Sequence, residues 1–301
     1  MTVLDKLNCA INYVEENIAD EIDLAKIAQL ACCSTYDFQR MFAFIADISI
    51  VEYIRRRRLT LSAFELQESD IKVVDLALKY GYESPVSFAR AFKAMHGITP
   101  AEARNSNVSL KAFSRISFQI TIKGVSEMNY RIVKTDSFKV FGLEGIVSTV
   151  GDEKYFPHEG AIWQENNSNG KYEQLFADAG DKRFSQYDIM FTKDMCKIHG
   201  LMNYKRIDDT TYGYMQCSFV TDESNTEGYS MFEIPATTWA VFPADVPDWN
   251  VGKAMETAYK RFYGEWLQTS EYEKVNSPQF EMYGGTAECG YIELWMPVIK
   301  K

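Results

Sequence analysis

The chain has 301 residues, of which 46% are hydrophobic and 25% charged, and its formal net charge is −10 with a pI near 5.0. This length and composition are typical of a globular protein with two or three domains, each large enough to bury a core. Acidic residues near the start exclude a signal peptide, and no run approaches the roughly 18 apolar residues of a membrane span. We therefore expect a cytoplasmic protein with no membrane partner.

The first hundred residues contain an internal repeat. Residues 23–42, moved forward by fifty positions, align without a gap on residues 73–92. Identical residues fall on one another in the pairs Ser34 with Ser84, Phe38 with Phe88, Arg40 with Arg90 and Phe42 with Phe92. A repeat of this length predicts one structural unit that is used twice.

Each copy has the pattern of a helix, a tight turn and a second helix. Apolar residues recur at helical spacing in the first part, and the small residues Ala31 and Gly81 then allow the turn. Ser34 and Ser84 are suited to N-cap positions, and Pro85 follows at the favoured first helical position. The second helix is therefore expected to begin at the same place in both copies.

A helix-turn-helix motif places its second helix in the major groove of DNA, where residues near the helix N-terminus meet base edges. In the two copies, the residues expected to contact DNA from this helix are Thr35, Tyr36, Gln39, Arg40, Ser84, Val86, Ser87, Arg90 and Lys93. Arginine can read guanine through two hydrogen bonds, and glutamine can read adenine in the same way. The alternative is a pair of ordinary amphipathic hairpins, but two copies in one register favour a double-stranded DNA partner.

The segments STYDFQRMF, IVEYIRRRRL and LALKYGYESPVSFARAFKAMHGITPAEAR resemble the AraC/XylS family of bacterial transcription regulators, over about residues 5–107. The resemblance implies an all-α DNA-binding domain over residues 1–107, with helix-turn-helix motifs at about 8–54 and 68–107. It also implies a long central helix, about Ile50 to Leu66, that holds the two reading helices on one face of the DNA. RNA polymerase is a further partner that the resemblance implies.

This chain departs from the family pattern at a few positions. Asp47 stands where the family often has glycine after the first reading helix. Pro85 and Val86 stand where relatives place polar side chains that read bases. The second copy is therefore expected to read fewer bases and to depend more on DNA shape and on backbone contacts.

The net charge of −10 by itself argues against a nucleic-acid partner, but the charge is unevenly distributed along the chain. Between Lys72 and Lys123 there are eight basic residues and three acidic ones, a net charge of +5. A run of arginines also lies on the central helix, and we expect Arg55, Arg56 and Arg57 to contact phosphates. The alternative for this run is a solvated helix face.

Metal and cofactor chemistry is not indicated. The six cysteines are scattered without a CxxC motif and only three histidines are present, so neither a zinc site nor a disulfide framework is predicted. The adjacent Cys32 and Cys33 are interpreted as small buried residues of the first turn. No nucleophile elbow or phosphate loop is found, so we predict no cofactor and no metal, and favour a protein that is not an enzyme.

After a linker at residues 108–127, the composition changes to short apolar runs of strand length and dense aromatic residues over 128–301. The segment YGYMQCSFV at 212–220 is matched by CGYIELWMPV at 289–298, and each is preceded by a strand, a helix and another strand. Helices are expected at about 159–177, with a polar break NNSNG, and at about 251–267. This pattern predicts two pseudo-twofold β-α-β-β units, and hence an α+β domain after the all-α one.

The C-terminal pattern, with YKRFYGEWLQTSEYE, FEMYGG and YIELWMPV, resembles the GyrI-like effector-binding domains of some regulators. Strand alternation sets Tyr291, Glu293 and Trp295 on one face and groups Glu281 with Tyr283, and we expect one groove face, turned away from the helices, to carry all five. The two tryptophans expected to wall the pocket are Trp163 and Trp239. Gln216 is expected in the first unit at the place of Glu293.

Carboxylates among aromatic rings suit a lipophilic, cationic small molecule as effector. A wet outer sheet face is the alternative for these residues. Some relatives of the effector fold are thought to hydrolyse small ligands, in which case Glu281 would be the base and Tyr283 the proton donor. A protein-interaction module is a further alternative. The linked DNA-binding domain favours a sensor, and both a monomer and a dimer remain open.

Overall fold

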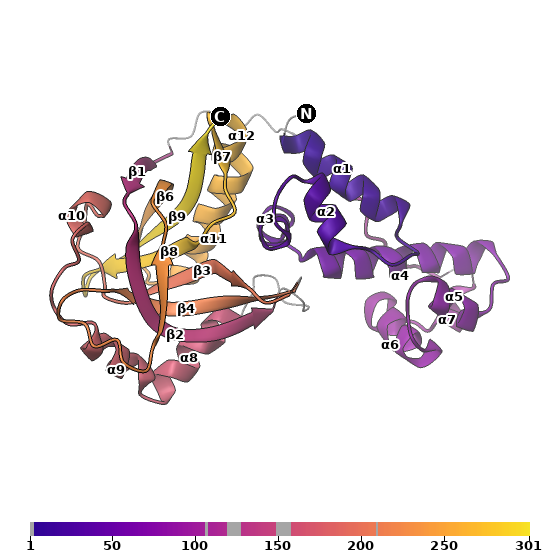
Figure 1. Ribbon diagram of the computed structural model, residues 1–301. Helices are drawn as coiled ribbons and strands as arrows, with labels where there is room; N and C mark the ends of the chain where they lie inside the picture. The colour runs from indigo at the N-terminus through magenta and orange to yellow at the C-terminus, as the bar shows by residue number, and fades with distance from the viewer. Residues whose placement is uncertain (1–2, 106–107, 119–127, 149–157, 209) are drawn as a thin grey trace. The chain divides into compact units, whose positions relative to one another are not determined.

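A computed structural model describes residues 3–105, 108–118, 128–148, 158–208 and 210–301 (Figure 1). These residues form two compact units. The first comprises residues up to Phe38 together with the segment that begins at Ile48, and the second comprises Gln39–Asp47 and the chain after residue 122, so the division falls within one helix. Among the described residues, no helix is long and apolar enough to cross a membrane.

The N-terminal part of the chain is helical, as predicted. Its helices are α1 (Val3–Glu16), α2 (Leu24–Leu30), α3 (Thr35–Ala46), α4 (Ile50–Glu68), α5 (Val73–Lys79), α6 (Pro85–His96) and α7 (Pro100–Ala103). The central helix α4 and the second motif share a core in which Leu59, Leu76, Phe88 and Phe92 are all fully buried. The second helix of the second motif is therefore held by the apolar side that the sequence predicts.

Local capping explains where these helices begin and end. The Ser84 hydroxyl accepts a hydrogen bond from the backbone N–H of Ser87, with Pro85 at the first helical position, and α6 ends at Gly97 with φ of +83°. In the first copy, Ser34 accepts the corresponding bond from the N–H of Asp37 at 3.1 Å. The two predicted N-caps are thus both present.

The turn of the first copy differs from the prediction. The left-handed residue there is Cys32, with φ of +56°, whereas the second copy uses Gly81, with φ of +75°. Helix α2 precedes α5 by forty-nine positions and α3 precedes α6 by fifty, so the repeat has a one-residue gap within the turn. Ala31 is therefore the wrong turn residue, and Cys32 is exposed rather than buried.

The C-terminal part is a curled antiparallel sheet with helices, which confirms the α+β class. The strands are β1 (Arg131–Thr135), β2 (Phe138–Ser148), β3 (His199–Arg206), β4 (Thr211–Phe219), β5 (Ser230–Ile234), β6 (Thr237–Val246), β7 (Tyr272–Lys274), β8 (Gln279–Gly285) and β9 (Gly290–Lys300). The helices are α8 (His158–Ser168), α9 (Lys171–Asp178), α10 (Tyr187–Met190), α11 (Val251–Arg261), the π-helical turn η1 (Phe262–Trp266) and α12 (Leu267–Thr269).

The strand order β1-β6-β9-β8-β3-β4-β2-β5, with β7 added to β9, has a pseudo-twofold centre between β8 and β3. Each half contains the expected β-α-β-β unit, one with α8 and α9 packed on β2 and one with α11 packed on β6 and β9 (Figure 1). The polar break divides the first helix at Gly170, whose φ is +77°. Across the centre of the sheet, Gly200 of β3 lies directly opposite Glu281 of β8.

The two faces of the sheet are buried by different elements. One face carries Trp239, Phe280 and Trp295 in a core that is closed by aromatic side chains from the segment around α10, Phe184 and Phe191. The other face is covered by α8, α9 and α11, where Phe242 packs edge-on against Phe262 and Trp266. A side chain's place on one face or the other therefore decides whether it meets the helices.

Candidate functional site

The second reading helix presents its outward side chains to solvent. Val86 is 78% exposed, and Arg90 and Lys93 are exposed as well. Ser84 and Ser87 are only partly exposed, because each hydroxyl is used within the helix start: Ser84 as the cap, and Ser87 as a donor to the Ser84 carbonyl at 2.8 Å. On this helix Arg90 and Lys93 are the polar side chains best placed to reach a nucleic acid.

The corresponding residues of α3 are buried in this structure. Thr35, Tyr36, Gln39 and Arg40 are all less than a tenth exposed. Their assignment as DNA contacts stays a prediction, and Arg40 is paired with Glu159 and Glu281 in this structure.

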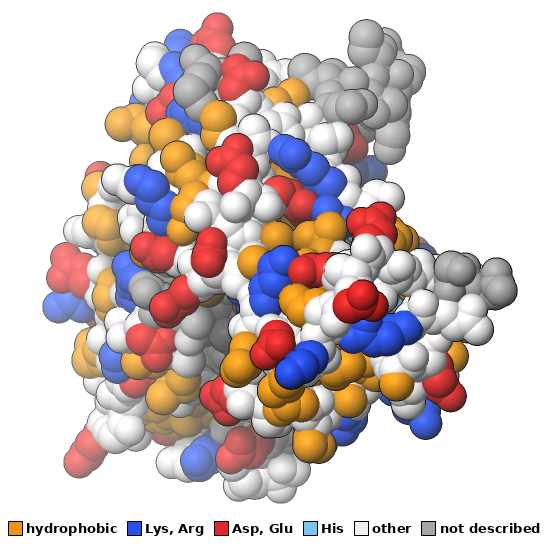
Figure 2. Space-filling view, turned by 90° about the vertical axis from the view of Figure 1, so that its right-hand side faces the viewer, with side chains coloured by type: hydrophobic (Ala, Val, Ile, Leu, Met, Phe, Trp, Pro, Cys, Tyr) orange, Lys and Arg blue, Asp and Glu red, His pale blue; other side chains and the backbone are white. Residues whose placement is uncertain are grey.

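The arginine run on α4 has internal partners. Arg55 and Arg56 both pair with Glu52, and Arg57 pairs with Glu15 and donates to the Phe113 carbonyl. Arg55 and Arg56 nevertheless remain more than a third exposed, whereas the Arg57 side chain is 11% exposed. In the face drawn in Figure 2, basic side chains are interspersed with acidic ones. Phosphate contact from this helix therefore remains a prediction, best suited to Arg55 and Arg56.

The second compact unit contains a cavity of about 470 Å³ between α8, α11 and the centre of the sheet. Its polar and aromatic lining residues are Arg40, Phe44, Glu159, Trp163, Tyr214, Glu256, Tyr259, Glu281 and Tyr283. Two of the acids, Glu159 from the start of α8 and Glu281 from β8, face each other across the guanidinium of Arg40. Carboxylates and aromatic rings of this kind can attract a positive charge.

Glu281 is the most deeply placed acid of this cavity, with 8% of its surface exposed. Its Oε2 accepts a hydrogen bond from the Tyr283 hydroxyl at 2.9 Å, and its Oε1 accepts one from the Tyr259 hydroxyl at 3.0 Å. Burial, and then the negative charge of Glu159, raise the pKa of the Glu281 carboxyl, although Arg40 and the two hydroxyls oppose the shift. A bound cation would therefore stabilise the ionised form.

The aromatic wall is fixed by contacts between rings. Trp163 on α8 donates its indole N–H to the Tyr214 hydroxyl, and its ring meets Tyr283 edge to face with centroids 5.4 Å apart. Gly200 leaves room for this arrangement, because a Cβ there would lie 2.6 Å from the Tyr214 hydroxyl oxygen. Burial holds the pKa of Tyr214 well above its usual range, so the hydroxyl stays neutral.

The expectation that one sheet face carries all five groove residues is wrong. In the pairing of β8 with β9, Phe280 lies opposite Trp295 and Met282 lies opposite Glu293. Directly opposite residues share a face, so Glu281 and Tyr283 point toward the helices and the cavity, while Tyr291, Glu293 and Trp295 point to the other face. The aliphatic residues of β9, and not its acid, share the helical side with Glu281.

Glu293 is fully buried on that other face and has three partners there. It accepts hydrogen bonds from the Tyr291 hydroxyl at 2.7 Å and the Trp295 indole at 2.9 Å, and it pairs with Arg131 at 2.7 Å. Trp239 is also fully buried, with its indole N–H donated to Thr135. In this structure Trp239, Glu293 and Trp295 are core residues and do not line the 470 Å³ cavity.

Gln216 does not stand at the place of Glu293. Gln216 pairs across the sheet with Gly200, which in turn pairs with Glu281, so Gln216 lies on the helical face. There its side chain accepts a hydrogen bond from Asn166 of α8. The sequence match between 212–220 and 289–298 is therefore structurally correct when it is aligned from the shared C-terminal valine, which sets Gln216 against Leu294.

Sequence reasoning assigned six of the polar and aromatic residues that line the cavity around Glu281 to no ligand site: Arg40, Phe44, Glu159, Tyr214, Glu256 and Tyr259. Tyr259 lies with Met255 on the buried stripe of α11, which continues to Phe262 of η1, so spacing alone indicates a core residue. Its hydroxyl is the signal that could have singled it out, because a tyrosine oxygen in an apolar stripe needs a partner. Glu159 carried no such signal.

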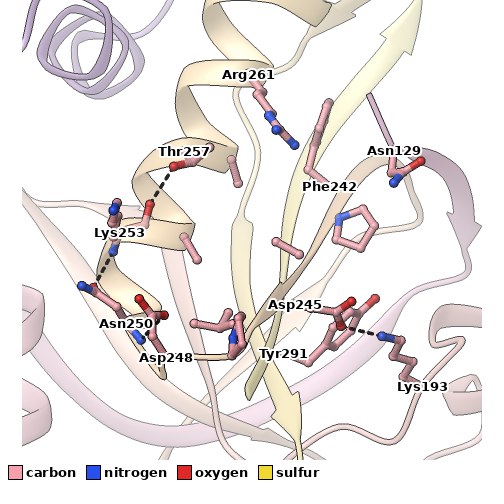
Figure 3. A pocket seen from close by; sticks show the side chains of 16 residues that line it. Asn129, Lys193, Phe242, Asp245, Asp248, Asn250, Lys253, Thr257, Arg261 and Tyr291 are labelled. Atoms are coloured by element: carbon pink, nitrogen blue, oxygen red, sulfur yellow. Dashed lines mark hydrogen bonds and ion pairs between the residues drawn. The ribbon is translucent and has the colours of Figure 1, made fainter. Parts of the chain in front are cut away.

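A second hollow, of about 730 Å³, lies between β6 and α11 (Figure 3). Lys193 pairs with Asp245 at 2.7 Å beside the Tyr291 ring, and both charged side chains are more than half exposed. Figure 3 shows these groups at one end and Arg261 with Phe242 at the other. Its charges are already solvated, so it has less to gain from a charged ligand than the cavity around Glu281.

Comparison with known proteins separates the two halves of the chain. The family described as integron-associated effector binding protein matches residues 131–298, and the helix-turn-helix domain family matches 27–106. The transcriptional activator AarP of Providencia stuartii is 41% identical over 95 residues, which are 32% of this chain and 70% of AarP. The regulatory protein SoxS of Salmonella typhimurium is 33% identical over 95 residues, 32% of this chain and 89% of SoxS.

Among solved structures, a putative transcription regulation protein of Staphylococcus aureus MU50 aligns with a TM-score of 0.41 and 20% identity, over 57% of this chain and 99% of that one. The family matches cover the DNA-binding repeat and the curled sheet in turn. The chain therefore belongs to the AraC-type transcription regulators and carries a GyrI-like effector-binding domain in its C-terminal half.

Proposed function

We propose that this regulator binds promoter DNA through both helix-turn-helix motifs and senses a lipophilic cation in the cavity around Glu281. The observation that supports the effector most directly is a buried carboxylate with a raised pKa, set between two tyrosine hydroxyls in an aromatic cavity of about 470 Å³. Ionising a buried acid is costly without a counter-charge, so a cation gains affinity by supplying one.

Ligand binding to the full chain tests the effector class. Tetraphenylphosphonium should quench the fluorescence of Trp163, and triphenylphosphine oxide, a neutral molecule of related shape, should bind more weakly. Replacing Glu281 by Gln should lower the affinity for the cation at least about tenfold and leave the neutral molecule unaffected. Glu165→Gln, an exposed acid of α8 outside the cavity, is the matched control. Equal loss for both molecules would mean that the carboxylate does not recognise charge.

DNA binding is tested separately by gel-shift titration at two salt concentrations. Arg90→Ala should weaken specific binding by about 1 to 3 kcal/mol, because it removes a base-reading arginine. Neutralising Arg56 should chiefly reduce the salt dependence. Lys171→Ala, an exposed residue of α9, is the control. Unchanged affinity in Arg90→Ala would overturn the reading of bases by α6. We also propose that the DNA-bound regulator recruits RNA polymerase, which a gel shift does not measure.

Hydrolysis of a ligand is the second candidate function, and the geometry favours it less. Both oxygens of Glu281 already accept hydrogen bonds from tyrosines, and Oε1 also accepts one from Arg40. These donors occupy the carboxylate oxygens that would have to accept the proton of an attacking water. Consumption of an aryl ester with repeated turnover, lost in Glu281→Gln, would favour the enzyme over the sensor.

A further inference from the structure

The cavity around Glu281 contains a cation from the protein itself, the Arg40 guanidinium, which belongs to the same compact unit. Its Nη1 donates to Oε1 of Glu159 at 2.8 Å, and its Nη2 donates to Oε1 of Glu281 at 3.0 Å and to the Tyr259 hydroxyl at 2.9 Å. The two carboxylates thus contact two different nitrogens of one planar group.

The same group also lies against aromatic rings. The Arg40 guanidinium carbon is 4.5 Å from the centre of the Tyr259 ring and 5.5 Å from that of Phe44. These two rings stack on each other with centroids 4.3 Å apart. Only 2% of the Arg40 side chain is exposed, so the ion pairs are almost fully desolvated. A flat cation with donors along its edge matches all of these contacts.

A quaternary ammonium or phosphonium ion matches them less well. Such an ion supplies charge but has no N–H, so it would leave the oxygens of Glu159 and Glu281 with fewer hydrogen bonds after water is expelled. An amidinium or guanidinium ion supplies both the charge and two donors, and a hydrogen bond to an ionised group is about twice as strong as a neutral one.

We propose, on the basis of the proposed function, that the effector is an aromatic amidinium or guanidinium compound that takes the place of the Arg40 guanidinium. Its two N–H edges meet Glu159 and Glu281, and its ring extends along Trp163 and Tyr283. Since the arginine must leave before the ligand enters, Arg40 lowers the affinity for every ligand of this site.

Calorimetric titration of the full chain provides the test, with benzamidine and phenylguanidine against phenyltrimethylammonium, which has a similar size but no donor. The chains are the wild type, Arg40→Met, which keeps the aliphatic stem without the charge, and Glu159→Gln. Arg183→Met removes an exposed arginine outside the cavity and is the matched control.

We expect the amidinium probes to bind at least about tenfold more tightly than the ammonium probe. Arg40→Met should tighten amidinium binding by a further factor of about ten, and Arg183→Met should leave it unchanged. Glu159→Gln should reduce the preference for the amidinium, because one of its two acceptors loses its charge. This last comparison uses the wild-type Arg40 and is informative even where Arg40→Met is poorly folded.

Two results would overturn the inference. Equal affinity for the donor and donor-free cations would mean that charge alone is recognised, in which case the proposed sensing of cations stands and its ligand class falls. If Glu159→Gln kept the same preference for the amidinium over the ammonium probe, Glu159 would not be a second acceptor for the ligand. If no cation binds any of the chains, the proposed effector function itself fails.

Discussion

Glu281 and Glu293 are the same residue type on neighbouring strands, each with a tyrosine two positions away and an arginine as partner, yet they lie in opposite kinds of environment. Glu281 faces the helices and borders a cavity, whereas Glu293 is fully buried in the core on the other side of the sheet. The difference shows that composition marks both residues as unusual, but only the register of the strands decides which acid can meet a ligand.

The prediction with the largest expected effect tests whether water is excluded from the sheet face that carries Glu293. His199 lies on that side, packed against Phe191 and Phe219, and burial lowers its pKa to about 3 from an ordinary value of 6.5. The unfolded chain therefore takes up the proton first, so this contribution to stability is complete above pH 6.5 and is lost as the pH falls toward 3. The total is on the order of 5 kcal/mol.

Denaturant unfolding followed by tryptophan fluorescence can measure this loss, since all five tryptophans lie after residue 162. His199→Gln should have a shallower fall in stability with acid than the wild type. Parallel curves for the two chains would mean that the face is open to water, and the comparison between the two glutamates would fail.

A second effect compares the two acids directly. Glu293→Gln leaves the Arg131 charge without its partner and should lower the free energy of unfolding by about 3 kcal/mol. Glu281→Gln should change it by less than about 1 kcal/mol, because Arg40 keeps Glu159 and the repulsion between the two acids is relieved. The same fluorescence-detected unfolding at pH 7 measures both. The opposite order would reverse the assignment of the structural and the ligand-binding acid.

The pH dependence of ligand affinity sharpens the comparison further. The pKa of Glu281 is raised above its ordinary value of 4.5, and the proposed cationic effector would bind the ionised form. Affinity should therefore fall as the pH is lowered, by up to about tenfold for each unit below the raised pKa. Calorimetric titration with benzamidine between pH 8 and pH 5 measures this fall. Glu281→Gln should abolish it, and a flat profile in the wild type would count against an ionisable acid in the site.

The smallest effect comes from the two tyrosines. Tyr283→Phe removes one donor from Glu281 and should change ligand affinity by about 1 kcal/mol with little effect on stability. Tyr291→Phe removes a donor from Glu293 and should cost about 1 kcal/mol of stability without affecting the ligand. Titration and unfolding of both variants separate the two roles. If one variant altered both ligand affinity and stability, the two faces of the sheet would not act independently.

Features that depend on neighbouring residues could be predicted from the sequence. The helix starts at Ser34 and Ser84 were predicted correctly, because a cap is a local hydrogen bond to the following turn. The break of the first C-terminal helix was also predicted, since Gly170 takes a conformation that other residues disfavour. The turn residue Cys32 was not predicted. The one-residue gap lies within the turn, and the matched residues of the two copies after it still align at a spacing of fifty.

The candidate site was predicted only in part, for a similar reason. Alternation correctly groups Glu281 with Tyr283, but the register of β8 against β9 is set by the connection between them and cannot be read from either strand alone. Glu159 and Tyr259 come together with Glu281 through helix packing over more than twenty residues of sequence. Contacts of this range have no signature in local spacing.

The pairing of Gly200 with Glu281 at the pseudo-twofold centre makes the two sides of the cavity chemically different. The two halves share their topology, but the acid of one half faces a residue without a side chain in the other, and the Tyr214 ring fills part of that space. A ligand with two equal cationic ends would find only one of them matched at this centre. We therefore expect a stoichiometry of one effector per chain, bound in a single orientation, although a fold with two halves of the same topology would suggest two.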